Sequence, residues 1–170
     1  MLKHLSNSAN YSLHQLYDVL DQTNDTQFSQ PLSILFQSSI GMHVRHIIEF
    51  YQCMILGVAT GSIHYDGRER NHKIETDIEY AKECIVTCIH HISEIEINND
   101  LCLITSQDLS NESFRIPTNV YRELTYLIEH TIHHMAIIKM AYNETYPLVK
   151  LPADFGIAYS TLKYQKSCAQ

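Results

Sequence analysis

Four stretches of this chain repeat apolar residues every three or four positions with polar residues between them, as amphipathic helices do. The pattern predicts helices over residues 5–23, 39–60, 77–97 and 119–143. In the first, one face carries Leu5, Ala9, Leu13, Leu16 and Leu20. Because a lone helix cannot bury such a face, four amphipathic helices of about 20 residues predict an all-α fold, a four-helix bundle.

Residues that favour helix ends support these boundaries. Either Ser38 or Ser39 is suited to cap the start of the second helix, and Gly61 is suited to end it. Thr76 and Glu79 have the spacing of a capping box, which predicts the start of the third helix.

The connections between the predicted helices differ in length. Residues 24–38 and 61–76 are long enough to cross an end of the bundle, so consecutive helices need not form antiparallel hairpins. The segments LCLITS and SFRIPT flank QDLSNE, a pattern that indicates a small β-hairpin between the third and fourth helices. No linker or repeat divides the chain, which predicts a single domain over 1–170. In the tail, the residues expected to pack back on the bundle are Phe155, Ile157, Tyr159 and Leu162.

Composition narrows the classes of function. The chain has 19 acidic against 12 basic residues and no basic run, which disfavours nucleic-acid binding. Its beginning, MLKHLSNSANYS, lacks the apolar region of a secretory signal, and no stretch approaches the roughly 18 apolar residues of a membrane span. The five cysteines, odd in number, lie mostly within helical patterns. We therefore expect a soluble cytoplasmic protein with reduced thiols that neither spans a membrane nor binds nucleic acid.

Histidine is unusually frequent, with 11 residues, and three of them lie in the segment EHTIHHM. His130 and His134 are separated by one helical turn, about 40° around the axis, so both imidazoles can reach one metal ion. His133 is directed away from the apolar face. A pair of histidines at the boundary of the core is an equally weighted alternative, and two ligands are too few for a stable site.

The second helix offers a third ligand in the segment HVRHIIE, where His43, His46 and Glu49 are spaced by three residues. One more imidazole would complete a three-histidine site with an open position, as catalytic zinc sites have. The helical wheel does not choose between them, because His43 borders the main apolar stripe and His46 lies farther round. Taken singly, each histidine is more typical of a structural residue.

Two acidic residues are candidates for a role beside the metal. Glu49 is one turn from His46 and could orient that ligand or act as a catalytic general base, and Glu123 lies two turns before His130. A solvated helix charge is the commoner interpretation for each, and Arg45 has the i, i+4 spacing of an ion-pair partner for Glu49.

Other side chains suggest weaker hypotheses. Cys84, Cys88 and His91 lie along one edge of the third helix and would form a second metal site, although buried cysteine is the commoner interpretation. Cys53, two turns after His46, is a candidate nucleophile, with core packing as the alternative. Arg68 and Arg70 could hold an anionic substrate, whereas a solvated or salt-bridged loop is the more common arrangement.

The stretches SIGMHVRHIIEFYQ and RELTYLIEHTIHHMAIIKM resemble the DinB/YfiT-like family of metal-dependent proteins. The resemblance implies an up-down-down-up four-helix bundle that binds one divalent metal. It places the second-helix ligand, the histidine of an SIGxxxxH pattern, at His46, and the H-x-x-x-H pair at His130 and His134. It also implies a possible homodimer. Three imidazoles suit nickel or zinc best among divalent metals.

Two classes of function follow from a three-histidine site. The first is a metal-dependent enzyme, a hydrolase or thiol-dependent transferase, acting on an unknown small molecule. The alternative is a non-catalytic metal-binding or interaction protein, whose metal mainly joins the second helix to the fourth. An accessible pocket favours the first, and a large loss of stability on chelation favours the second.

Overall fold

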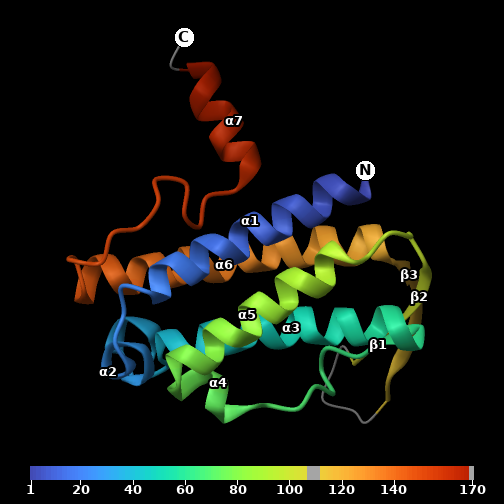
Figure 1. Ribbon diagram of the computed structural model, residues 1–170, viewed down its shortest axis with the longest axis horizontal. Coiled ribbons are helices and arrows are strands. Elements are labelled where there is room, and N and C mark those ends of the chain that lie inside the picture. The colour runs from blue at the N-terminus through green and yellow to red at the C-terminus, as the bar shows by residue number, and fades with distance from the viewer. Residues whose placement is uncertain (107–111, 169–170) are drawn as a thin grey trace.

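The computed structural model describes residues 1–106 and 112–168 and is predominantly helical. Its four long helices are α1 (Leu2–Leu20), α3 (Ile40–Thr60), α5 (Ile78–Ser93) and α6 (Val120–Thr145). Both α1 and α3 pack against α5 and α6. Figure 1 shows that α1 and α6 run in one direction and that α3 and α5 run in the other. The four predicted helices are therefore present, and α3 and α6 are antiparallel neighbours.

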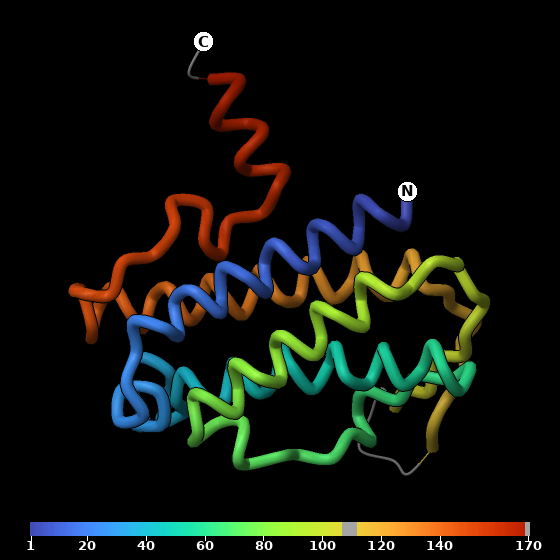
Figure 2. Tube along the Cα trace, viewed as in Figure 1, coloured from blue at the N-terminus to red at the C-terminus, as the bar shows by residue number. Residues whose placement is uncertain are grey.

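Shorter elements fill the two long connections. Between α1 and α3 lie α2 (Asp25–Ser29) and a 3-10 turn, η1 (Ser33–Leu35). Between α3 and α5 lie β1 (Ser62–Ile63) and α4 (His72–Thr76). Because α3 and α5 run the same way, residues 61–77 must return along the bundle, as the tube in Figure 2 shows. The expectation that adjacent helices need not form hairpins is confirmed.

Helix ends agree with the expected caps at α3 but not at α5. The Ser39 side chain accepts the backbone N–H of Met42, and Gly61 adopts a left-handed conformation with φ of 83° at the end of the helix. The capping box of Thr76 and Glu79 is wrong. Thr76 ends α4, and Asp77 caps α5 by accepting the Tyr80 N–H, because the helix begins one residue later than the capping box would require.

The predicted hairpin forms two strands of a three-stranded sheet. β2 (Asp100–Thr105) pairs antiparallel with β3 (Phe114–Asn119), with Cys102 opposite Pro117. β1 adds a parallel third strand, in which Ser62 is opposite Cys102. Pro117 is tolerated because β3 is an edge strand. Most of the expected turn, residues 107–111, lies outside the described part of the chain.

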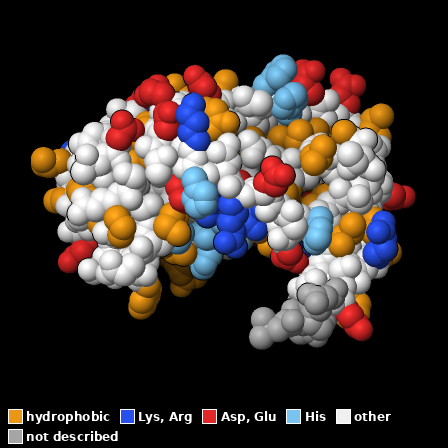
Figure 3. Space-filling model, turned by 90° about the horizontal axis from the view of Figure 1, so that it is seen from below, with side chains coloured by type: hydrophobic (Ala, Val, Ile, Leu, Met, Phe, Trp, Pro, Cys, Tyr) orange, Lys and Arg blue, Asp and Glu red, His pale blue; other side chains and the backbone are white. Residues whose placement is uncertain are grey.

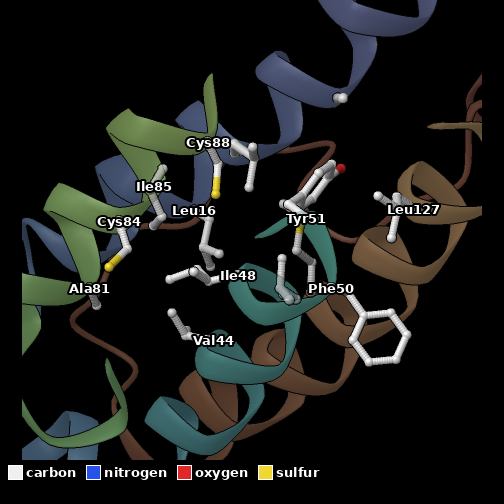
Figure 4. Close-up of a cluster of buried hydrophobic side chains, with 14 of the residues drawn as sticks. Leu16, Val44, Ile48, Phe50, Tyr51, Ala81, Cys84, Ile85, Cys88 and Leu127 are labelled. Carbon is white, nitrogen blue, oxygen red and sulfur yellow. The ribbon is translucent and has the colours of Figure 1, made fainter. Parts of the chain in front are cut away.

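The core lies between the four long helices, and Figure 4 shows part of it around Ile48 and Tyr51. Phe155 of the tail is fully buried, whereas Ile157, Tyr159 and Leu162 are only half-buried. Helix α7 (Tyr159–Cys168) has no buried residue and projects away from the bundle (Figure 1). The tail therefore packs back only in part. Within 1–106 and 112–168, no helix has the length and apolarity needed to cross a bilayer.

Candidate metal centre

Three histidines converge where α3 faces α6. His46, His130 and His134 each offer a ring nitrogen, and these three atoms lie within 4.8 Å of one another. The Nε2 atoms of His46 and His130 are 2.8 Å apart, although the residues are 84 positions apart in sequence. Among the described residues, no other group of histidine, cysteine or acidic side chains comes together in this way. The three rings are those that the family resemblance implies.

The spacing of these nitrogens suits a shared metal ion. Two imidazole nitrogens at about 2.1 Å from one cation are separated by about 3.0 Å at a right angle and about 3.4 Å at a tetrahedral angle. The separation of 2.8 Å between His46 and His130 is close to the first value, and the limit of 4.8 Å for the whole group leaves room for small adjustments. Neutral nitrogen donors without a carboxylate are typical of sites for zinc, nickel and copper.

The surroundings keep these imidazoles neutral. Burial, followed by the nearby charge of Arg68, lowers the pKa of His46 to about 3. Burial, followed by the neighbouring histidines, lowers the pKa of His134 to about 3, and burial also lowers the pKa of His130. Since only an unprotonated nitrogen can bind a metal, neutral rings need no net loss of a proton at neutral pH, provided that the remaining ring proton lies on the nitrogen that faces away from the metal.

His43 supports His134 and lies outside the group of three. Nδ1 of His43 is 3.0 Å from Nδ1 of His134, and Nε2 of His43 is 3.2 Å from the Ser38 hydroxyl. That hydroxyl donates to the Leu35 carbonyl at 2.8 Å, so it accepts from His43. His43 then carries its proton on Nε2 and accepts the Nδ1 proton of His134. Nε2 of His134 is left with a lone pair for a metal, as in sites where an outer partner orients the ligand.

The turn that carries Ser38 has an unusual backbone. Phe36 and Gln37 both have positive φ, at 52° and 69°, a backbone conformation that residues other than glycine and asparagine rarely adopt. The Gln37 N–H donates to the Leu32 carbonyl, and the Leu32 N–H donates to the Ser38 carbonyl. These bonds close the turn and place the Ser38 hydroxyl within reach of His43.

Aromatic side chains enclose the His130 ring. Phe50 stacks on His130 with ring centroids 4.6 Å apart, and Tyr126 stacks on it at 5.4 Å. Tyr65 stacks on Phe50 in turn, at 4.8 Å. These contacts restrict the orientation of His130, and they exclude water from one side of the candidate centre.

Glu49 is buried, so its interpretation as a solvated charge is wrong. Its side chain is 2% exposed, pairs with Arg45 at 3.5 Å and accepts Arg68 Nε at 3.1 Å and the Asn71 N–H at 2.8 Å. Another nitrogen of Arg68, Nη2, lies 3.0 Å from Nδ1 of His46. On the face seen in Figure 3, which is the lower side of the molecule in Figure 1, histidine side chains lie beside arginine or lysine side chains. Arg68 therefore joins Glu49 to His46, and its ion pair with Glu49 matches the salt-bridged alternative for this loop.

Glu123 is also buried rather than solvated. Its carboxylate is fully inaccessible, accepts hydrogen bonds from the hydroxyls of Tyr65 and Thr118, and pairs with Arg122. Because Tyr65 stacks on Phe50, this carboxylate helps to hold the aromatic wall around His130. Among the described residues, its hydrogen-bond partners are Tyr65, Thr118 and Arg122 and none of the three candidate ligands, so its role is to position other groups.

The cysteine hypotheses receive little support. Cys84 and Cys88 are buried and His91 is exposed, so these three side chains do not meet around one point. Burial raises the pKa of Cys53, which disfavours a reactive thiolate. Cys53 instead lines a cavity of about 520 Å³, together with Glu49, Gln52, Thr60, His64 and Arg68.

Sequence reasoning missed three contributors to this centre: Ser38, the contact of Arg68 with His46, and Phe50. Phe50 stands four residues after His46, and the helical period would have placed the two rings on one face. No comparable signal existed for Arg68, because its position depends on how residues 64–71 fold over α3. His133 is exposed, as expected from the helical wheel.

No protein-family model matches this chain. The chain is similar to FK506-binding protein 5 of Rhizopus delemar, with 35% identity over 108 residues, which is 61% of this chain. The matched region covers 28% of the length of that protein.

Proposed function

We propose that this protein binds one divalent metal ion, nickel or zinc, through His46, His130 and His134. We further propose that it is a metal-dependent enzyme that acts on a small molecule. The observation that carries the proposal is the convergence of three neutral imidazole nitrogens from α3 and α6 within 4.8 Å. Three imidazoles leave a coordination position open, which distinguishes catalytic from closed structural sites.

The chemistry we propose is hydrolysis or thiol-dependent transfer. A bound divalent cation supplies a Lewis acid that polarises a carbonyl group or activates a nucleophile at neutral pH. A cavity of about 520 Å³ lies beside Glu49 and Arg68 and is large enough for a small molecule; none of the three histidines lines it, so a substrate there would reach the metal only past Arg68. Glu49 was the expected general base, but its carboxylate is held by Arg45, Arg68 and the Asn71 amide, and we propose that it orients His46 instead.

A purely structural metal is the second candidate, but the packing of α3 on α6 argues against it. The two helices already bury Val44, Ile47, Tyr51, Leu127 and Met135 in the core. A metal would therefore add a link between helices that apolar contacts already hold together.

We further propose that the protein is a DinB/YfiT-like protein. Two features support this assignment: the helix directions, with α1 and α6 opposed to α3 and α5, and the origin of the three histidines on α3 and α6. The similarity to FK506-binding protein 5 covers little of that protein, and we assign no FK506 binding to this chain.

Metal analysis of protein purified without a histidine tag tests the proposal. After reconstitution with zinc or nickel, we expect about one ion per chain, and His46→Ala, His130→Ala and His134→Ala should each lose it. His91→Ala is the matched control, because His91 is exposed and lies on α5. Equal metal content in all variants, or only traces in the wild-type protein, would refute the site.

Activity and melting separate the two candidate functions. The loaded protein should act on a member of a panel of esters, amides and thiol-conjugation substrates. With free metal at about 100 times Kd, binding should raise the melting temperature by roughly 5–10 °C, which is the effect of mass action alone. A much larger loss of stability on chelation, without activity on any substrate class, would favour the structural metal.

A further inference from the structure

Arg68 holds His46 in a form that is incompatible with metal binding. Nη2 of Arg68 is 3.0 Å from Nδ1 of His46, and a guanidinium can only donate hydrogen bonds. Nδ1 of His46 is therefore the acceptor, and the single proton of the neutral ring lies on Nε2. That proton points at Nε2 of His130, 2.8 Å away, where a shared cation would lie.

Either mode of coordination requires Arg68 to leave His46. If Nε2 of His46 binds the metal, the ring proton must move to Nδ1, where it would face an N–H of Arg68. If Nδ1 binds the metal, its lone pair is no longer available to Arg68. The first mode brings together the facing Nε2 atoms of His46 and His130 and is the one that the geometry favours.

We propose that Arg68 and Glu49 form a latch that opens when the metal binds, an inference that rests on the metal site proposed above. The Arg68 side chain leaves His46 and Glu49 and turns into the cavity that Arg68 already lines. The freed carboxylate of Glu49 then accepts the new Nδ1 proton of His46. His46 gives its Nε2 proton to solvent and takes one from solvent at Nδ1, so the number of protons on the ring is unchanged.

The rest of the Glu49 environment allows this exchange. Oε1 of Glu49 accepts the Asn71 N–H at 2.8 Å and faces Arg45 at 3.5 Å, so the carboxylate stays in place when Arg68 leaves. Arg68 bonds to Glu49 through Oε2, at 3.1 Å. A carboxylate behind a ligating histidine is the usual arrangement in metalloproteins, and loss of such a partner typically weakens metal binding 10- to 100-fold.

The latch predicts opposite effects for the two members of one ion pair. Arg68→Gln removes the obligatory donor facing His46 and should tighten zinc binding about 10-fold, the scale of one charged hydrogen bond. Glu49→Gln removes the carboxylate that stabilises the bound state and should weaken it about 10-fold or more. Arg70→Gln, on the same loop and exposed, is the control and should leave the zinc affinity unchanged. Affinity is measured by competition with a chromophoric chelator.

A purely structural ion pair would give another result. Both variants would then change the zinc affinity in the same direction or not at all, and either result in folded protein would overturn the latch. If the wild-type protein bound neither zinc nor nickel, the proposed function and the latch would fall together. If it bound zinc but the two variants shifted alike, only the latch would fail.

Histidine ¹⁵N NMR of the wild-type protein tests the latch without any variant near Glu49. The metal-free protein should show the His46 proton on Nε2, and the zinc-saturated protein should show it on Nδ1. His46→Gln assigns the resonance. The same protonated nitrogen before and after zinc addition would overturn the latch, whatever the stability of the variants.

Discussion

Nδ1 of His43 lies 3.0 Å from Nδ1 of His134, and this contact joins a residue of α3 to a candidate ligand on α6. His43 borders the candidate metal ligands, and its other nitrogen is held by Ser38. The sequence left open whether His43 or His46 is the third candidate ligand, and the structure gives the two residues different positions. His46 faces His130, and His43 directs the lone pair of His134.

The first prediction concerns His43. His43→Ala should weaken zinc binding about 10- to 100-fold, because His134 loses the acceptor that fixes its tautomer. Ser38→Ala should act in the same direction with a smaller effect. His133→Ala is the matched control, since His133 is adjacent to His134 but exposed. Zinc competition titrations of the three variants provide the measurement, and equal affinities for His43→Ala and His133→Ala would contradict the assigned role.

The second prediction is that the metal-free protein loses stability in mild acid. The pKa of His46 and of His134 is lowered to about 3, mainly by burial, whereas each unfolded imidazole has a pKa of about 6.5. As the pH falls from about 6.5 towards 3, the unfolded chain binds protons that the native rings do not, so the free energy of unfolding decreases.

Melting curves in chelator between about pH 7 and pH 5 check this dependence, in a range where most carboxylates stay ionised. The double variant His46→Gln and His134→Gln should show a weaker dependence, because it lacks the two imidazoles with the lowest pKa. A melting temperature of the wild-type protein that stays constant over this range would contradict the prediction.

The third prediction concerns the buried carboxylate of Glu123. Glu123→Ala should lower the free energy of unfolding by about 2–4 kcal/mol, because it leaves the hydroxyls of Tyr65 and Thr118 without their acceptor. Glu129→Ala, at an exposed position of the same helix, should change it by less than about 0.5 kcal/mol. Denaturant unfolding measures both, and equal effects would rule out the buried network as the cause.

The fourth prediction compares two glycines, one in the first turn of α3 and one directly after its end. A Cβ at Gly41 would overlap the backbone carbonyl of Glu75, where α4 crosses α3 closely. Gly41→Ala should therefore cost about 2–3 kcal/mol of unfolding free energy through overpacking. A Cβ at Gly61 would meet no atom within 4 Å, so Gly61→Ala should cost only about 1 kcal/mol, from its φ of 83°. Urea unfolding of both variants is the test, and a larger loss at Gly61 would contradict this account.

Apolar periodicity was sufficient to predict the long helices, because each must bury one face whatever its partners. The predicted range 39–60 differs from α3 by one residue at its start, where Ser39 caps the helix. α2, α4 and β1 were missed, since elements of two to five residues are too short to show a period. They exist because the connections must pack against the bundle that the long helices form.

The burial of the two glutamates could not be predicted from their helices. On a helical wheel, Glu49 and Glu123 are charged residues at the edge of an apolar face. The loop that carries Arg68, and Tyr65 beside it, folds over both and supplies the donors that a buried carboxylate requires. Those donors lie 19 and 58 residues away from the carboxylates they contact, so only the folded chain brings them together.

By itself, the sequence determined that His130 and His134 share one face of a helix, because a separation of four residues is nearly one helical turn. It also determined that His133 faces elsewhere. Tertiary structure decided that His46 of α3 lies close to both, whereas His43 contacts His134 from outside the group. That choice depends on the rotation and offset of α3 against α6, which are set by the packing of the whole core and by no local pattern of residues.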